Sequence, residues 1–333
     1  MSVMTDGPAP VARRFDSKVL AKLAIRLGAF VAFGGILIYF AMTARGFTSP
    51  YNLMTVVEQS AILGFLAFGM TIVFAGTGTD VQRGGIDLSL AANAGLCAAV
   101  YAVLMREGYG NGLAIPAALV TGMFIGFLNG VAVVTLKIIP LLGTLAVMNI
   151  AAGLELTLTE NTVVPVNTPL MQFIAFGRFL GISTLAWCLI IVSALLAWLM
   201  HFHRIGLRLY AVGGHHEAAR AAGIDTGRYI YGAYIGAGLL AGLTSILIVS
   251  RLSSSTPGTG LMLLPILAAT LLGTVFSRRF IPTIGGTLLA ALFIGYLANG
   301  FQLLGLLSYW IAGVQGVLIL LVVAVTSSFA KRN

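Results

Sequence analysis

The chain has 333 residues, of which 59% are hydrophobic and only 9% are charged. A soluble domain carries about a quarter charged residues, so this composition excludes a water-soluble protein and indicates an integral membrane protein. The net charge of +9 does not indicate nucleic-acid binding, because the basic residues stand singly or in pairs between apolar runs. Cys97 and Cys188 lie within such runs and are expected to be buried thiols.

The apolar runs predict about ten transmembrane helices, because runs of about 16–25 residues are long enough to cross the hydrocarbon core as helices. They lack the alternation of a β-barrel. We therefore expect an all-α polytopic protein with a basic N-terminal segment, 1–26, and a transmembrane domain, 27–329. The predicted spans are 27–43, 53–75, 88–105, 113–136, 138–158, 182–200, 229–250, 261–276, 283–301 and 306–328.

The basic residues predict the orientation of the chain. With the N-terminus in the cytoplasm, most Lys and Arg residues lie inside, and only Arg45, Arg106, Arg178 and Arg251 lie outside. This bias agrees with the positive-inside rule, and an even number of spans places the C-terminus in the cytoplasm as well. Two connections are long: 159–181 is then external, and 201–228 is cytoplasmic.

Two short segments hint at an internal repeat. "FIGFLNG" (124–130) resembles "FIGYLANG" (293–300), and the two lie five spans apart, so they would cross the membrane in opposite directions. Inverted five-helix repeats of this kind occur in many transporters, and chance recurrence of common membrane residues is the alternative.

Glycines at four-residue spacing predict close contacts between helices, because small residues let helix backbones approach where lipid offers no hydrophobic drive. These are Gly122, Gly126 and Gly130, the pair Gly232 and Gly236, and the pair Gly238 and Gly242.

The predicted spans contain few ionisable residues. None carries a central Asp, Lys or Arg, and Glu58 and Glu155 lie toward the outer ends of their spans. Because buried charges mark ion and proton pathways, their scarcity favours a neutral solute such as a sugar or polyol. The candidate pathway residues are Asn129, Asn149, Asn299 and Gln302, for each of which an ordinary interhelical hydrogen bond is the alternative.

Catalytic motifs are absent from the sequence. It has no GxxxxGK[ST] phosphate-binding loop, no HExxH and no GxSxG. "HFH" (201–203) and the pair His215 and His216 could bind a metal, but a ligand shell needs further acids or cysteines, so a solvated loop is favoured. We expect no catalytic residue, no metal and no cofactor bound by this chain.

The polar residues gather instead in "YAVGGHHEAARAAGIDTGR" (210–228). Gly213 and Gly214 are expected to break the chain, residues 215–222 to form a helix, and Gly223 to end it in a left-handed conformation. Glu217 and Arg220 suit the dipole of this helix, and Ala218 and Ala219 belong to a small face that could press on another protein. An ordinary connector is the alternative.

The first 16 residues of this stretch resemble the cytoplasmic coupling segment of permease subunits of ribose/galactose-type ABC sugar importers. "GGIDLS" (84–89) resembles the most distinctive motif of that family, and 285–305 resembles its ninth span. The resemblance implies a fold of about ten helices in the bacterial cytoplasmic membrane. It also implies three partners: cytoplasmic ATPase subunits that use ATP, a second permease copy or paralogue, and an external solute-binding protein.

The resemblance assigns residues to two functional elements. Gly213, Gly214, Glu217, Ala218, Ala219, Arg220 and Gly223 would form the ATPase-coupling helix, and Gly84, Gly85, Asp87 and Ser89 would form the turn of the family motif. From the residues alone, Asp87 or Ser89 can cap the third span. The sequence leaves open whether this motif reaches the cytoplasm or turns back within the membrane.

The chain departs from the family pattern in four places: an insertion at 76–83, an atypical segment at 273–284, "LMLLP" at 261–265, and Ala152 where Arg is usual. These departures suggest one half of an asymmetric permease pair. A secondary carrier driven by an ion gradient and a membrane scaffold are the alternative functions. The identity of the solute stays open.

Overall fold

The apolar runs fold as helices, because inside a bilayer every backbone N–H and C=O group must find its partner within the segment. The computed structural model of the chain describes residues 17–78, 85–277, 281–306, 310, 312–314 and 316–317. Its α-helices are α1 (Ser17–Thr43), α2 (Pro50–Thr77), α3 (Leu90–Arg106), α4 (Asn111–Gly130), α5 (Pro140–Thr159), α6 (Pro169–Phe176), α7 (Thr184–His201), α8 (Arg204–Gly214), α9 (His216–Ala221), α10 (Thr226–Leu252), α11 (Leu263–Phe276) and α12 (Ile284–Leu303).

Short elements complete the described part of the chain. They are a π-helix, η1 (Val131–Thr135), a 3-10 helix, η2 (Thr259–Met262), and four strands, β1 (Val164–Pro165), β2 (Arg178–Phe179), β3 (Ile182–Ser183) and β4 (Ser254–Ser255). β1 pairs with β4 and β2 with β3, both antiparallel, with Val164 opposite Ser255 and Arg178 opposite Ser183.

The predicted spans agree closely with the helices. In the described residues, six helices are long and apolar enough to cross a membrane, including α2, α5, α7 and α12, and Leu27–Thr43, α3 and α11 are shorter apolar helices. The protein is therefore a mostly helical, polytopic membrane protein. The tenth predicted span, 306–328, lies largely outside the described residues.

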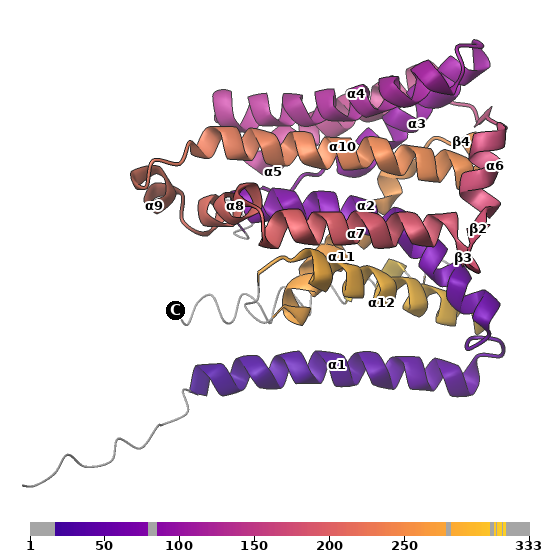
Figure 1. The fold of residues 1–333 in the computed structure, drawn as a ribbon, viewed down its shortest axis with the longest axis horizontal. Coiled ribbons are helices and arrows are strands. Elements are labelled where there is room, and N and C mark those ends of the chain that lie inside the picture. Colours follow the sequence, from indigo (N-terminus) through magenta and orange to yellow (C-terminus); the bar gives the residue numbers. More distant parts are fainter. Residues whose placement is uncertain are drawn as a thin grey trace, which may run out of the picture.

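Helix α2 forms the centre of the bundle, and its most apolar stretch is completely buried. Helices α7, α8, α10, α11 and α12 pack around it. In Figure 1, α10 and α7 run lengthwise beside α2, while α1 lies at the edge of the bundle next to α11 and α12. Helix α5 lies behind α10 in this view. Such a buried central helix explains why the sequence of α2 is apolar all round rather than on one face.

Glycines allow the backbones of α4 and α10 to lie in direct contact, as the glycine spacing predicts. A Cβ on Gly126 would overlap the carbonyl oxygen of Tyr234, and one on Gly122 would overlap that of Gly238. Gly242 faces the backbone of Leu119 in the same way. The prediction is confirmed for these glycines.

The same prediction is wrong for Gly232 and Gly236. No atom of the described residues lies within 4 Å of the position that a Cβ would take on either residue. Both glycines line a hollow beside α7 instead, so spacing alone did not reveal which face of α10 contacts α4.

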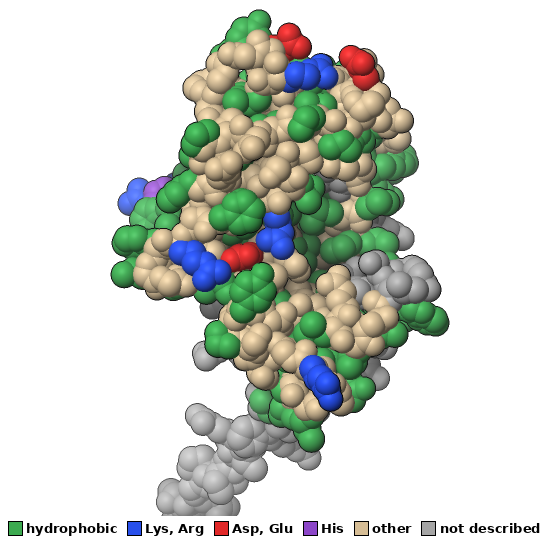
Figure 2. Space-filling view, turned by 90° about the vertical axis from the view of Figure 1, so that its right-hand side faces the viewer, with side chains coloured by type: hydrophobic (Ala, Val, Ile, Leu, Met, Phe, Trp, Pro, Cys, Tyr) green, Lys and Arg blue, Asp and Glu red, His purple; other side chains and the backbone are tan. Residues whose placement is uncertain are grey.

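The two ends of the bundle differ in structure (Figure 1). One end, called here the α9 end, carries α8 and α9. The opposite end, called the α6 end, carries α6 and the two strand pairs. The predicted long connections are thus partly helical: 159–181 contains α6, and 201–228 contains α8 and α9. Figure 2 shows the α6 end, where the few acidic side chains lie beside basic ones among uncharged groups.

Candidate functional site

Helix α9 lies where the sequence predicts a coupling helix, and both of its ends are capped. At its start, Nδ1 of His215 accepts a hydrogen bond from the Ala218 N–H at 3.1 Å. At its end, Gly223 has a φ of +78° and donates its N–H to the Arg220 carbonyl at 2.9 Å. Ile224 then donates to the Ala219 carbonyl at 3.0 Å. These caps hold a helix of six residues that is too short to be stable alone.

The predicted coupling residues divide into an inner and an outer set. Ala219 is buried, whereas Glu217, Ala218 and Arg220 are exposed, as is Gly223. The helix therefore exposes Ala218 and two side chains of opposite charge, and it packs against the bundle through Ala219.

Gly213 and Gly214 have different environments. They do not break the chain before a helix but form the last residues of α8. A Cβ on Gly213 would overlap the Ala75 carbonyl oxygen and lie 3.1 Å from the Gly78 nitrogen, so α8 touches the end of α2 backbone to backbone. In the part of the chain that the structure describes, no atom lies within 4 Å of the Cβ position of Gly214. Gly213 is thus required for packing.

A hollow of about 1040 Å³ lies beside α8, and its lining includes Gly213, Gly214, Tyr210 and Pro282. The Tyr210 hydroxyl donates a hydrogen bond to the Pro282 carbonyl at 2.9 Å. Burial raises the pKa of this hydroxyl to about 12, so it keeps the proton that it donates. This bond ties α8 to the connection between α11 and α12, which is the atypical segment 273–284.

The family motif from Gly85 to Ser89 lies inside the bundle. Asp87 Oδ1 accepts hydrogen bonds from the N–H of Ser89 at 2.9 Å, from its hydroxyl at 2.7 Å and from Nδ2 of Asn129 at 3.1 Å. Asn129 Nδ2 also donates to Ser89 Oγ at 2.7 Å. All three side chains are at most 1% exposed. Asp87 therefore caps α3, while Ser89, its N-cap residue, makes no side-chain cap bond.

Neighbouring hydroxyl groups hold the backbone of this motif. Thr77 Oγ1 accepts from the Gly85 N–H at 2.8 Å, and Thr144 Oγ1 donates to the Ile86 carbonyl at 3.0 Å. A Cβ on Gly85 would lie 2.7 Å from both Thr77 Oγ1 and the Tyr234 hydroxyl oxygen. The motif thus joins α2, α4, α5 and α10 at one buried point. Gly84 lies outside the described residues.

The candidate pathway residues do not gather in one place. Asn129 belongs to the Asp87 cluster, and Asn299 exchanges two hydrogen bonds with Asn52, at 2.8 and 2.9 Å. Asn149 is exposed on α5 and donates to the Leu145 carbonyl at 2.8 Å. Gln302 is exposed near the end of α12. Sequence reasoning missed Asn52, because its partner Asn299 is distant in the chain.

Glu155 is a further acidic residue, which the sequence placed only toward the outer end of its span. Glu155 is 3% exposed and lies on α5, where its carboxylate occupies the space beside Gly95 of α3. Glu58, by contrast, lies 3.7 Å from Arg251 in a partly exposed ion pair. Among the described residues, no group of three His, Cys, Asp or Glu side chains could hold a metal ion.

Comparison with known proteins agrees with this arrangement. Residues 52–323 match the family described as the permease component of the branched-chain amino acid transport system. The chain is 35% identical to the ribose import permease protein RbsC of Bacillus subtilis over 93% of both chains. It is 36% identical to RbsC of Escherichia coli K12 over 82% of this chain and 85% of the relative.

A third relative is the L-arabinose ABC transporter permease protein AraH of Azospirillum brasilense. It is 27% identical over 91% of this chain and 87% of its own. The match extends from the second helix to beyond α12 and so covers both the α9 region and the buried motif. The chain belongs to this permease family and is a non-enzymatic, multi-pass inner-membrane permease component of a bacterial ABC importer.

Proposed function

We propose that the chain translocates a sugar or a sugar-like neutral solute. The observation that carries this proposal is the 35% identity, over 93% of both chains, to a permease named for ribose import. The spans support it, because none of those that the structure describes has an Asp, Lys or Arg in its middle. Such spans suit an uncharged solute, since an ion or proton pathway uses buried charges.

Helix α9 is the element that we assign to ATPase coupling. Its outward face is small and carries Glu217 and Arg220, which can pair with opposite charges in a groove of the ATPase. Because α9 is capped at both ends and only residues 222–225 separate it from α10, a displacement of α9 is passed to a transmembrane helix through a short connection. ATP is then used by the partner subunit alone.

In this proposal the α9 end faces the cytoplasm, together with the termini. This end carries Lys137 before α5, Arg204 and Arg208 in α8, Arg220 in α9 and Arg228 in the first turn of α10, which agrees with the positive-inside rule. The α6 end then faces the external solute-binding protein.

The exposed face of α5 suits a second permease and the solute pathway between the two. Ala146, Asn149, Gly153 and Thr157 lie along it at helical spacing and are exposed in the single chain. None of the described residues has an atom within 4 Å of the Cβ position of Gly153. Small residues with one amide allow a close helix contact or a narrow polar passage. The partner in our proposal is a paralogue with the standard family loops.

The finer architecture that we propose has ten spans in two inverted halves. Gly126 of "FIGFLNG" and Gly295 of "FIGYLANG" both lie against another helix: Gly126 faces the Tyr234 carbonyl of α10, and Gly295 faces the Ser60 hydroxyl of α2. In an inverted repeat, the fourth span (α4) would be equivalent to the ninth (α12), and the second span (α2) to the seventh (α10). The contact between α4 and α10 would then be equivalent to the contact between α12 and α2.

The test is uptake of labelled ribose by vesicles that contain this permease, its co-purifying subunits and a solute-binding protein. An ABC importer needs ATP and tolerates an ionophore, whereas a secondary carrier loses uptake when the ion gradient collapses. Glu217→Arg is expected to leave the protein inserted but to separate ATP hydrolysis from uptake. Glu107→Arg, an exposed acid after α3, is the matched control. Uptake without ATP, or normal uptake by Glu217→Arg, would contradict the proposal.

A further inference from the structure

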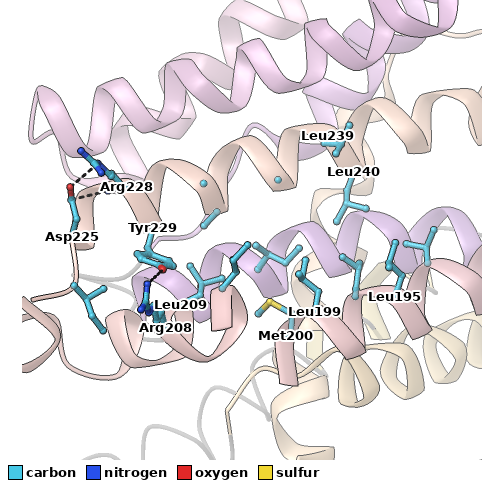
Figure 3. Close-up of a pocket in the computed structure, with 18 of the residues that line it drawn as sticks. Leu195, Leu199, Met200, Arg208, Leu209, Asp225, Arg228, Tyr229, Leu239 and Leu240 are labelled. Atoms are coloured by element: carbon cyan, nitrogen blue, oxygen red, sulfur yellow. Dashed lines mark hydrogen bonds and ion pairs between the residues drawn. The ribbon is translucent and has the colours of Figure 1, made fainter. Parts of the chain in front are cut away.

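A groove of about 850 Å³ runs between α7 and α10, and it lies apart from both the buried motif and the exposed face of α5. Its walls are aliphatic, with Leu195 and Leu199 from α7 and Leu239 and Leu240 from α10 (Figure 3). Ile72 of α2 contributes to its lining. These walls offer almost no hydrogen bonds, so the groove does not suit a polyhydroxylated solute.

Two glycines keep this groove open. Gly232 and Gly236 belong to its lining, and neither has an atom within 4 Å of its Cβ position. On another face of the same helix, Gly238 contacts Gly122 of α4 through their backbones. The glycines of α10 therefore serve two purposes: one set lets a helix approach, and the other leaves space that no described side chain fills.

The mouth of the groove, at the α9 end, is cationic (Figure 3). Arg208 Nη1 donates to the Tyr229 hydroxyl at 3.4 Å, and Arg228 Nε lies 2.9 Å from Asp225 Oδ2. The mouth thus holds two guanidinium groups and one carboxylate, and that carboxylate pairs with Arg228. The Arg228 side chain is 87% exposed, and Arg208 is exposed as well, so both can bind an anion.

The dimensions match one leaflet of a bilayer. From Arg228 to Leu243 the α10 backbone rises about 22 Å at 1.5 Å per residue, and one leaflet with its head groups is roughly 20–22 Å thick. A ligand of this length has an anionic head at the arginines and an aliphatic body along the leucines. We propose that the groove binds an anionic phospholipid of the leaflet at the α9 end, with its phosphate between Arg208 and Arg228.

The positive charge at the mouth favours an anionic phospholipid over the alternative occupants of the groove. Basic pockets between transmembrane helices bind acidic lipid head groups, and each arginine near the surface strengthens such binding about fivefold. A second permease copy would bring another helix into the groove and would leave the excess positive charge at its mouth without an anionic partner. A zwitterionic lipid fits the aliphatic walls but gains less from the excess positive charge.

The experiment is native mass spectrometry of the full-length chain in mild detergent. The protein is titrated with phosphatidylglycerol and, separately, with phosphatidylcholine that has the same acyl chains. The wild type is expected to retain one phosphatidylglycerol molecule in preference to phosphatidylcholine. The double variant Arg208→Gln/Arg228→Gln should bind phosphatidylglycerol about 25-fold more weakly, because two fivefold contributions are lost.

Matched variants separate this site from general attraction. Arg204→Gln removes an exposed arginine of α8 outside the groove lining and should leave the preference within about twofold of wild type. Gly232→Leu/Gly236→Leu should fill the groove and weaken retention of both lipids, whereas Gly34→Leu/Gly35→Leu on α1 should not.

Three results would overturn the proposal. They are equal retention of the two lipids by the wild type, an effect of Arg204→Gln as large as that of the double variant, and a change of oligomeric state in Gly232→Leu/Gly236→Leu with lipid retention intact. The last result would assign the groove to a second copy of the chain. The arginine variants decide the outcome even where a groove-filling variant fails to fold, since both arginines are exposed.

Discussion

Gly126→Ala tests whether the backbone contact between α4 and α10 stabilises the bundle. The new Cβ would overlap the Tyr234 carbonyl oxygen and lie 2.8 Å from the carbonyl carbon. Carbon atoms pack best at about 3.5–4.0 Å, so the two helices must separate by roughly 1 Å. Overpacking of this kind costs about 1–3 kcal/mol. The gain in helix propensity from Gly to Ala, up to about 1 kcal/mol, offsets only part of that cost.

The assay is thermal unfolding of the purified chain in detergent. With a net cost of about 1–2 kcal/mol, at about 2–4 °C per kcal/mol, Gly126→Ala should lower Tm by roughly 2–8 °C. Gly35→Ala is the matched control, because it makes the same change in α1 where no atom lies within 4 Å, and it should leave Tm unchanged or slightly raised. Equal Tm values for the two variants would show that α4 and α10 are not in backbone contact.

Three further predictions concern the buried polar groups and α8. Asp87→Ala removes the acceptor of three hydrogen bonds and should lower the free energy of unfolding by about 2–4 kcal/mol. Asp87→Asn keeps one oxygen and should lower it less, and unfolding of both variants in detergent measures the difference. A double-mutant cycle with Asn52→Leu and Asn299→Leu should give a coupling energy of about 1 kcal/mol, and a value near zero would contradict the paired geometry. Gly213→Ala should lower Tm by several degrees through its clash with α2, whereas Gly214→Ala should not, and both are compared by the same assay.

The sequence predicted the helices well, because long apolar runs have one viable structure in a bilayer. The predicted span 138–158, for example, corresponds to α5, Pro140–Thr159. Helix α8 was missed. Its sequence, Arg204–Gly214, mixes arginines and glycines with aliphatic residues and reads as a loop. Its buried residues, Gly206, Leu209 and Val212, nevertheless recur every three positions, which is the spacing of a helix with one buried face, so the sequence did contain a signal for α8.

The candidate site was predicted in part. Local signals identified α9 and its left-handed end at Gly223, since caps and helix formers act over neighbouring residues. Asp87 or Ser89 was expected to cap α3. Ser89 makes no side-chain cap bond, whereas Asp87 accepts a hydrogen bond from the N–H of Ser89. Its second partner, Asn129, was selected only as a polar residue within a span, because the hydrogen bond between them joins residues 42 positions apart.

The contact between α8 and α2 links the two motifs that the sequence singled out separately. Gly213 lies against the backbone of Ala75 and Gly78 with no side chain between them. Thr77, in the same turn of α2, accepts a hydrogen bond from the Gly85 N–H. From Gly85 the chain continues to Asp87 and its buried partners. Because close-packed backbones cannot compress, a displacement of α8 must move the end of α2 or open a gap beside it. The buried motif is therefore the nearest polar structure that a movement at the α9 end would disturb.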